Sequence, residues 1–170
     1  MLRIHLIALG LLSTTFLVQI KADNSVTSID QQYSSVKQTG LDKLNIKPGD
    51  VYPLIEKINQ KRFQVTEAGR SYLNKPIYKI QVGNGPLAIL MWSQMHGNEP
   101  TATASLFDFI NYINDPANED WYQSWKDKIT LHLVPMINPD GADLNQRYNA
   151  QDIDINRDKI IVFIFIALVF

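Results

Sequence analysis

The middle of the chain alternates between strand-like and helix-like patterns of apolar residues. Apolar and polar residues alternate over Ile77–Val82, as in a half-buried strand, and the turn residues 83–86 follow. Leu87–Trp92 is a nearly unbroken apolar run, which predicts a central strand of a sheet. A further strand is predicted at Ile129–Ile137, closed by a strong turn signal at Asn138–Gly141.

Helical spacing separates these predicted strands. Apolar residues recur at i, i+3, i+4 and i+7, which marks one face of a helix: Leu106, Phe109, Ile110 and Ile113. The pair Asp115-Pro116 ends that helix, because a proline disfavours helical backbone in the residue before it. The succession of strand, helix and strand predicts an α/β fold with a largely buried sheet.

Upstream of this region the pattern is weaker. Residues 23–60 are mostly polar, and we expect them to form an N-terminal polar segment or a propiece, with a short helix at Val51–Gln60. Phe63 and Val65 then suggest a strand that runs into a turn at Ala68–Ser71.

The two ends of the chain differ from the middle. Residues 1–22 resemble a secretory signal peptide, with Arg3, an apolar stretch at Ile4–Ile20 and cleavage expected near Ala22. We therefore expect a secreted or periplasmic protein with no stable membrane span after cleavage, the alternative being an uncleaved anchor.

At the other end, Ile160–Phe170 contains no polar side chain and is too short to span a bilayer. Such a run is either a buried strand or a tail, residues 159–170, that is foreign to the fold because the chain was cut short. We favour the second interpretation.

Composition narrows the chemistry. The chain has 170 residues, enough for one domain, and its net charge of -1 gives no reason to expect a nucleic-acid partner. Because there is no cysteine, disulfides, thiol nucleophiles and thiolate metal sites are excluded, so any metal must be bound by His, Asp or Glu. The histidines are His5, His96 and His132.

The segment His96-Gly97-Asn98-Glu99 follows the apolar run that precedes the predicted helix. Sites of α/β proteins lie at such strand ends, and the imidazole of His96 and the carboxylate of Glu99 are good Zn²⁺ ligands. Their spacing across a turn lets both reach one ion, and Gly97 gives the turn backbone freedom. The structural alternative is that His96 only caps the helix and that Glu99 is an acidic residue of its first turn, stabilised by the helix dipole.

A second polar region reads Arg-Tyr-Asn at 147–149 and Asp-Ile-Asn-Arg-Asp at 154–158. The guanidinium groups of Arg147 and Arg157 can bind a carboxylate through two parallel hydrogen bonds, and Asn156 adds a directed amide donor. By itself this region also fits a solvated loop of mixed charge.

Together with Asn-Pro-Asp-Gly at 138–141, these segments resemble the zinc carboxypeptidase (carboxypeptidase A) family over about residues 60–158. The resemblance implies the N-terminal half of a mixed-sheet zinc carboxypeptidase fold with flanking helices, and a partial catalytic domain at 61–158. It further implies hydrolysis of the C-terminal peptide bond of a peptide or protein substrate with one Zn²⁺ ion.

The resemblance also implies roles for single residues. His96 and Glu99 correspond to the first two zinc ligands of the family, and Arg147 to the arginine that stabilises the oxyanion. Asn156 and Arg157 correspond to the pair that binds the terminal carboxylate of the substrate.

The sequence departs from the family in its last part. The family takes a third ligand, a His, and a general-base Glu from positions well downstream of the Asn-Arg pair, and this chain has neither after Arg157. His132 lies in mid-strand, where the family has no ligand, and Asp152 stands where relatives usually have Gly. We therefore expect weak zinc binding and an inactive, truncated form.

Two alternative functions remain open. Aspartoacylase-like N-acyl amino acid deacylases share the His-Gly-Asn-Glu and Asp-x-Asn-Arg segments, although the turn at 138–141 and the signal peptide favour the carboxypeptidase. The other alternative is a non-catalytic remnant or binding module.

Overall fold

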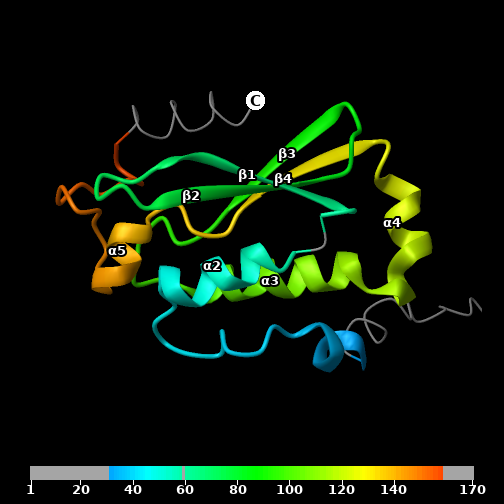
Figure 1. The fold of residues 1–170 in the computed structure, drawn as a ribbon, viewed down its shortest axis with the longest axis horizontal. Coiled ribbons are helices and arrows are strands. Elements are labelled where there is room, and N and C mark those ends of the chain that lie inside the picture. Colours follow the sequence, from blue (N-terminus) through cyan, green and yellow to red (C-terminus); the bar gives the residue numbers. More distant parts are fainter. Residues whose placement is uncertain (1–30, 59, 159–170) are drawn as a thin grey trace, which may run out of the picture.

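The computed structural model describes residues 31–58 and 60–158, so the predictions for the signal peptide and the apolar tail lie outside the described residues (Figure 1). Residues 31–36 are helical. The elements that follow are α2 (Pro48–Glu56), β1 (Phe63–Arg70), β2 (Pro76–Val82), β3 (Leu87–Trp92), α3 (Thr101–Asn114), the 3-10 helix η1 (Pro116–Asn118), α4 (Glu119–Trp125), β4 (Ile129–Val134) and α5 (Pro139–Leu144). Within the described ranges no helix is long and apolar enough to cross a membrane.

The strands form one mixed sheet in the order β1-β2-β4-β3. The pairs β1–β2 and β2–β4 are antiparallel, whereas β3 and β4 are parallel and joined by a crossover through α3 and α4. The predicted α/β fold with a mixed sheet and flanking helices is confirmed. Because β3 and β4 are parallel, the loops that follow them emerge at the same edge of the sheet.

Within the described part of the chain, β3 is an edge strand, so the prediction of a central strand is wrong there. It pairs with β4 on one side, and large apolar side chains on it are exposed: Leu87 (57%), Ile89 (37%) and Trp92 (41%). A continuous apolar run is typical of strands that are buried on both faces, and the described residues supply only part of that burial.

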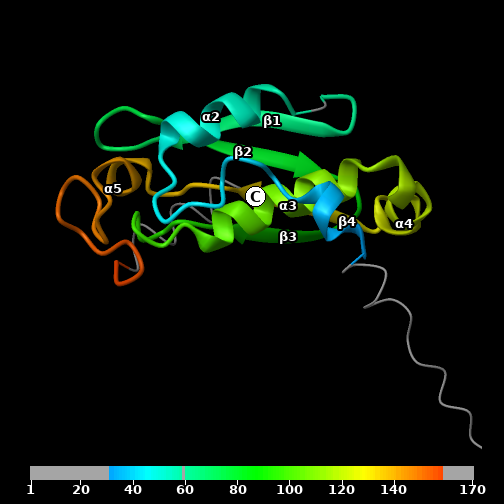
Figure 2. The same ribbon diagram turned by 90° about the horizontal axis from the view of Figure 1, so that it is seen from below.

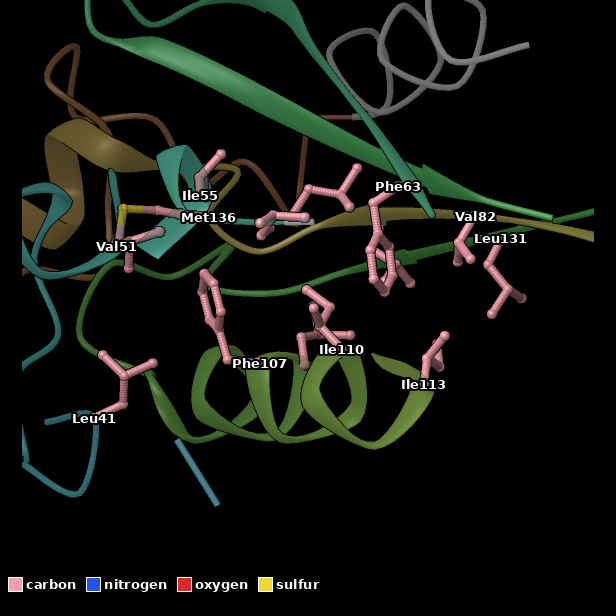
Figure 3. Packing of buried hydrophobic residues seen from close by; sticks show 14 of the residues in the cluster. Leu41, Val51, Ile55, Phe63, Val82, Phe107, Ile110, Ile113, Leu131 and Met136 are labelled. Carbon is pink, nitrogen blue, oxygen red and sulfur yellow. The ribbon is translucent and has the colours of Figure 1, made fainter. Parts of the chain in front are cut away.

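α2 and α3 cover one face of the sheet, as both ribbon views show (Figures 1 and 2). The main core lies between these helices and the sheet. In it, Phe107, Ile110 and Ile113 of α3 face Phe63 and Leu131 of the sheet (Figure 3). The helical face predicted for α3 is confirmed, with Phe107 more deeply buried than Phe109. The opposite face carries a smaller cluster of Ile77, Val134 and Ile137.

The N-terminal polar segment contributes to this same core. Leu41, Ile46, Val51 and Ile55 are all buried in the cluster that includes α3 and the sheet. At the start of α2, the carboxylate of Asp50 accepts a hydrogen bond from the backbone N–H of Lys47 at 2.9 Å, which satisfies a donor at the helix terminus.

Several element boundaries differ from the predictions. α2 begins at Pro48 rather than Val51 and ends at Glu56, because proline fits the first helical position. β1 continues through the predicted turn to Arg70, with a register shift between Glu67 and Gly69 that absorbs one extra residue. α4 was not predicted, because its apolar residues show no clear helical period in the sequence.

Candidate functional site

The loops after β3 and β4 lie side by side beyond the parallel strand ends. The backbone N–H of Ile137 donates to the carbonyl of Ser93 at 3.1 Å, and that of Asn138 donates to Gln94 at 3.2 Å. These bonds extend the β3–β4 pairing into the loops. The His-Gly-Asn-Glu and Asn-Pro-Asp-Gly segments are therefore neighbours in space.

Gly97 and Gly141 mark the point of closest approach between the two segments. A Cβ atom on Gly97 would lie 1.9 Å from the backbone carbon of Gly141, and one on Gly141 would lie 2.5 Å from the carbonyl oxygen of Tyr148. Neither glycine has a positive φ. Gly97 is thus required for a steric reason, because two backbones meet there, and not for the backbone freedom in a turn that the sequence suggested.

Asn138-Pro139-Asp140-Gly141 forms the start of α5 rather than a free turn. The side chain of Asn138 accepts a hydrogen bond from the N–H of Gly141 at 2.9 Å and donates one to the carbonyl of Met95 at 3.1 Å. Asp140 is 1% exposed and accepts from the hydroxyl of Ser71 at 2.9 Å. This segment therefore supports the site through its backbone and its buried polar contacts.

His96 and Glu99 converge as the sequence predicted. Nδ1 of His96 lies 3.1 Å from Oε2 of Glu99, and the N–H of Glu99 donates to the carbonyl of His96 to close the turn between them. The His96 side chain is 9% exposed, whereas that of Glu99 is 62% exposed. The imidazole of His96 is thus held inside the protein, whereas the carboxylate of Glu99 faces solvent.

Asp154 connects these residues to Arg147. One carboxylate oxygen lies 3.0 Å from Nε2 of His96, and the other accepts from Nε of Arg147 at 3.0 Å. Nη1 of Arg147 lies 3.4 Å from Oε1 of Glu99, which completes a ring of four charged or polar side chains. The structure therefore brings together three of the predicted site residues, His96, Glu99 and Arg147.

Asp154 was not predicted from the sequence as a site residue. The available signal was its position two residues before Asn156, in a segment already singled out. Burial acts to raise the pKa of its carboxyl group, but the hydrogen bonds from His96 and Arg147 and the charge of Arg147 outweigh it and hold that pKa below the ordinary value of 3.8. Asp154 is thus a carboxylate at neutral pH, so Nε2 of His96 carries the proton between them.

Asn156 and Arg157 follow Asp154 closely in the chain, and both side chains are exposed. The N–H of Asn156 donates to Asp154 at 3.0 Å, so the pair predicted to bind substrate is linked to the residue that contacts His96. The preceding loop is closed by Asn149, and Asp152 within it has a φ of 60°. Asp152 is thus in the left-handed region of backbone conformation, which glycine enters at little cost and aspartate enters at some cost.

The arrangement fits two ligands of a metal ion. Tetrahedral Zn²⁺ with bonds of about 2.0–2.2 Å holds two ligand atoms roughly 3.4 Å apart, slightly more than the 3.1 Å between Nδ1 of His96 and Oε2 of Glu99. A hydrogen bond from Nε2 to a carboxylate is the usual support for a metal-bound histidine. Among the described residues, however, no group of three or more His, Cys, Asp or Glu side chains is placed to hold a metal. The third ligand of a catalytic zinc site is not found in that part of the chain.

His132 lies in the middle of β4, in register with Gln81 on one side and Leu90 on the other. Burial lowers the pKa of its imidazole, and the charge of Lys79 lowers it further. Its place within the sheet is that of a packed strand histidine.

The zinc carboxypeptidase family matches residues 51–166 of this chain. Among curated proteins, carboxypeptidase SOL1 of Arabidopsis thaliana is 31% identical over 97 residues, which cover 53% of this chain and 20% of that protein. Gamma-D-glutamyl-L-diamino acid endopeptidase 1 of Lysinibacillus sphaericus is 36% identical over 87 residues, covering 48% and 22%. The chain thus spans about a fifth of the length of these relatives.

Solved structures share the fold. A metallo-carboxypeptidase from Burkholderia cenocepacia aligns with a TM-score of 0.62 at 18% identity, over 73% of this chain and 38% of that one. A metallo-carboxypeptidase from Pseudomonas aeruginosa, in complex with (2-guanidinoethylmercapto)succinic acid, gives a TM-score of 0.61 at 24% identity, over 73% and 36%. With two thirds of its sequence matched and the same arrangement of strands and helices, this chain belongs to the zinc carboxypeptidase family.

Proposed function

We propose that His96 and Glu99 are two of the protein ligands of a single catalytic zinc ion in a metallocarboxypeptidase. The observation that carries this proposal is the 3.1 Å approach of Nδ1 of His96 to Oε2 of Glu99, with Asp154 behind the imidazole. A zinc ion at such a site would polarise the carbonyl of the scissile peptide bond and activate a water molecule for its hydrolysis.

Arg147 is suited to stabilise the oxyanion that forms on the scissile carbonyl. Asp154 binds its Nε, which leaves the guanidinium head oriented toward Glu99 at the solvent side of the site. A fixed guanidinium next to the metal ligands provides donors where negative charge develops. Its partial exposure, 36% of the side chain, is consistent with access for a substrate.

Asn156 and Arg157 are suited to bind the C-terminal carboxylate of a peptide substrate. Both are exposed and lie next to Asp154, so a carboxylate bound there is held close to Arg147 and His96. The planar fork of Arg157 can bind both carboxylate oxygens, which would restrict cleavage to the last residue of a chain. The proposed substrates are therefore peptides or proteins with a free C-terminus.

Zinc titration tests the metal site. We expect the chain to bind Zn²⁺ weakly, because two protein ligands are fewer than the three usual at catalytic sites. Calorimetry should show that His96→Ala abolishes this binding, whereas His132→Ala, the matched histidine control, leaves it unchanged. Binding that survives His96→Ala would refute the proposed site.

An activity assay tests the proposed reaction. We expect this chain by itself to release C-terminal residues far more slowly than a full-length relative, since removal of a general base alone typically slows such reactions by about 100- to 10,000-fold. Zinc-supplemented protein should be assayed on peptides with free and amidated C-termini and on N-acetyl amino acids. Robust release from the free peptides would contradict the inactive state, and deacylation instead would favour the aspartoacylase-like alternative.

A further inference from the structure

A buried glutamine lies directly behind the metal-ligand pair. Gln94 is 3% exposed, and its amide group makes contacts in three directions. Nε2 donates to the carbonyl of Ile46 at 2.7 Å and to the carbonyl of Gly97 at 2.9 Å, while Oε1 accepts from the hydroxyl of Thr103 at 2.9 Å. One side chain thus links the N-terminal segment, the ligand loop and α3.

The backbone of Gln94 is in a conformation that glutamine rarely adopts. Its φ is 51°, in the left-handed region that glycine enters at little cost and most other residues avoid. A glycine at this position would remove the strain but also the amide group. The strained backbone therefore carries an amide group whose two N–H donors and whose oxygen acceptor all form hydrogen bonds.

The ligand loop is held by its carbonyl groups. Each carbonyl from Ser93 to Gly97 accepts a hydrogen bond, and the donors in chain order are the N–H of Ile137, the N–H of Asn138, the side chain of Asn138, the N–H of Glu99 and the side chain of Gln94. The last of these fixes Gly97, which lies within the turn that joins His96 to Glu99. The donors to the other four carbonyl groups belong to the loop after β4 or, for His96, to Glu99 at the end of the turn.

We propose that Gln94 is a positioning residue for the metal-ligand pair, acting through the carbonyl of Gly97 to set the convergence of His96 and Glu99. This inference rests on the proposed zinc site. The hydrogen bonds of the Gln94 amide go to neither ligand side chain. They restrict the backbone between the two ligands, so that both donor atoms keep the separation that one zinc ion requires.

Two substitutions separate the amide group from the backbone. Gln94→Gly removes the amide and relieves the positive φ, whereas Gln94→Met removes the amide but keeps the length of the side chain and the strain. Loss of a residue that orients a metal ligand typically lowers metal affinity about 10- to 100-fold. We expect both variants to raise the Kd for Zn²⁺ by about tenfold or more, because both free the carbonyl of Gly97.

The matched controls exclude general destabilisation and relief of strain as causes. Ile113→Val lowers stability through the core at the far end of α3, and Asn74→Gly relieves another positive φ, 65°, in the turn between β1 and β2. Both controls should keep the zinc affinity of the unchanged chain under conditions where every protein is folded. Unchanged affinity in the two Gln94 variants would overturn the proposal.

A second readout needs no metal. Nδ1 of the His96 ring lies 3.1 Å from Glu99 and Nε2 lies 3.0 Å from Asp154, so the ¹⁵N chemical shifts of the imidazole report both contacts. We expect these shifts to change in the Gln94 variants and to stay the same in the controls; unchanged shifts in the Gln94 variants would refute the positioning role. If the unchanged chain binds no zinc at His96, the zinc-site proposal fails, and the ring spectrum still decides the role of Gln94.

Discussion

Gly97 lies against the first turn of α5 with no room for a side chain. A methyl group there would meet the backbone of Gly141, which cannot move without shifting α5. We expect Gly97→Ala to lower the free energy of unfolding by about 1–3 kcal/mol, the usual range for overpacking. Urea unfolding measures this directly. Gly49→Ala in α2 is the control, since a Cβ atom there would have no neighbour within 4 Å, and it should be neutral or stabilising.

His132 makes stability depend on pH. Because burial and Lys79 lower its pKa in the folded chain, the unfolded chain binds more protons below the ordinary value of 6.5. The contribution of neutral His132 to the free energy of unfolding is therefore fully present above about pH 6.5. It is lost as the pH falls through the lower pKa that His132 has in the folded chain. Thermal unfolding between pH 8 and pH 5 should show this decline.

The variant His132→Gln removes the titrating group while keeping a polar side chain on β4. We expect a shallower decline of the unfolding temperature with falling pH than in the unchanged chain. An identical pH dependence in both proteins would show that other groups are responsible.

At the scale of the element, β3 combines an apolar sequence with an exposed edge. Such edges favour association with other chains. Leu87 is 57% exposed there, so Leu87→Lys should reduce association while changing the free energy of unfolding by only about 0.5 kcal/mol. Light scattering across a concentration series measures the association. Leu44→Lys, at a 90% exposed position away from this edge, should leave it unchanged, and equal effects of both substitutions would contradict a role for the edge.

For the molecule as a whole, the proposed destination follows from residues 1–22. We expect export and cleavage near Ala22, because Arg3 and the apolar stretch precede polar sequence. Mass spectrometry of the protein from a secreting host would give the mature N-terminus. A chain that keeps Met1 in the cytosolic fraction would contradict this prediction.

Much of the fold and of the site could be predicted from local sequence. Apolar spacing was sufficient for β2, β3, α3 and β4, because the periods of strands and helices are properties of neighbouring residues. The residue types and spacing of His96 and Glu99 were sufficient to predict a converging pair. Family resemblance added Arg147, which the structure places beside Glu99.

Other features depend on contacts between residues far apart in the chain. The edge position of β3 is set by strand order, which its own apolar run does not encode. Gly97 is required because α5 approaches it, and Asp154 joins the site because its loop folds back onto His96 across 58 residues. The sequence by itself therefore determined most of the elements and the chemical types of the site, because these are local. Only the tertiary structure decided which backbones and side chains meet, because the free energy of those contacts depends on the packing of the whole domain.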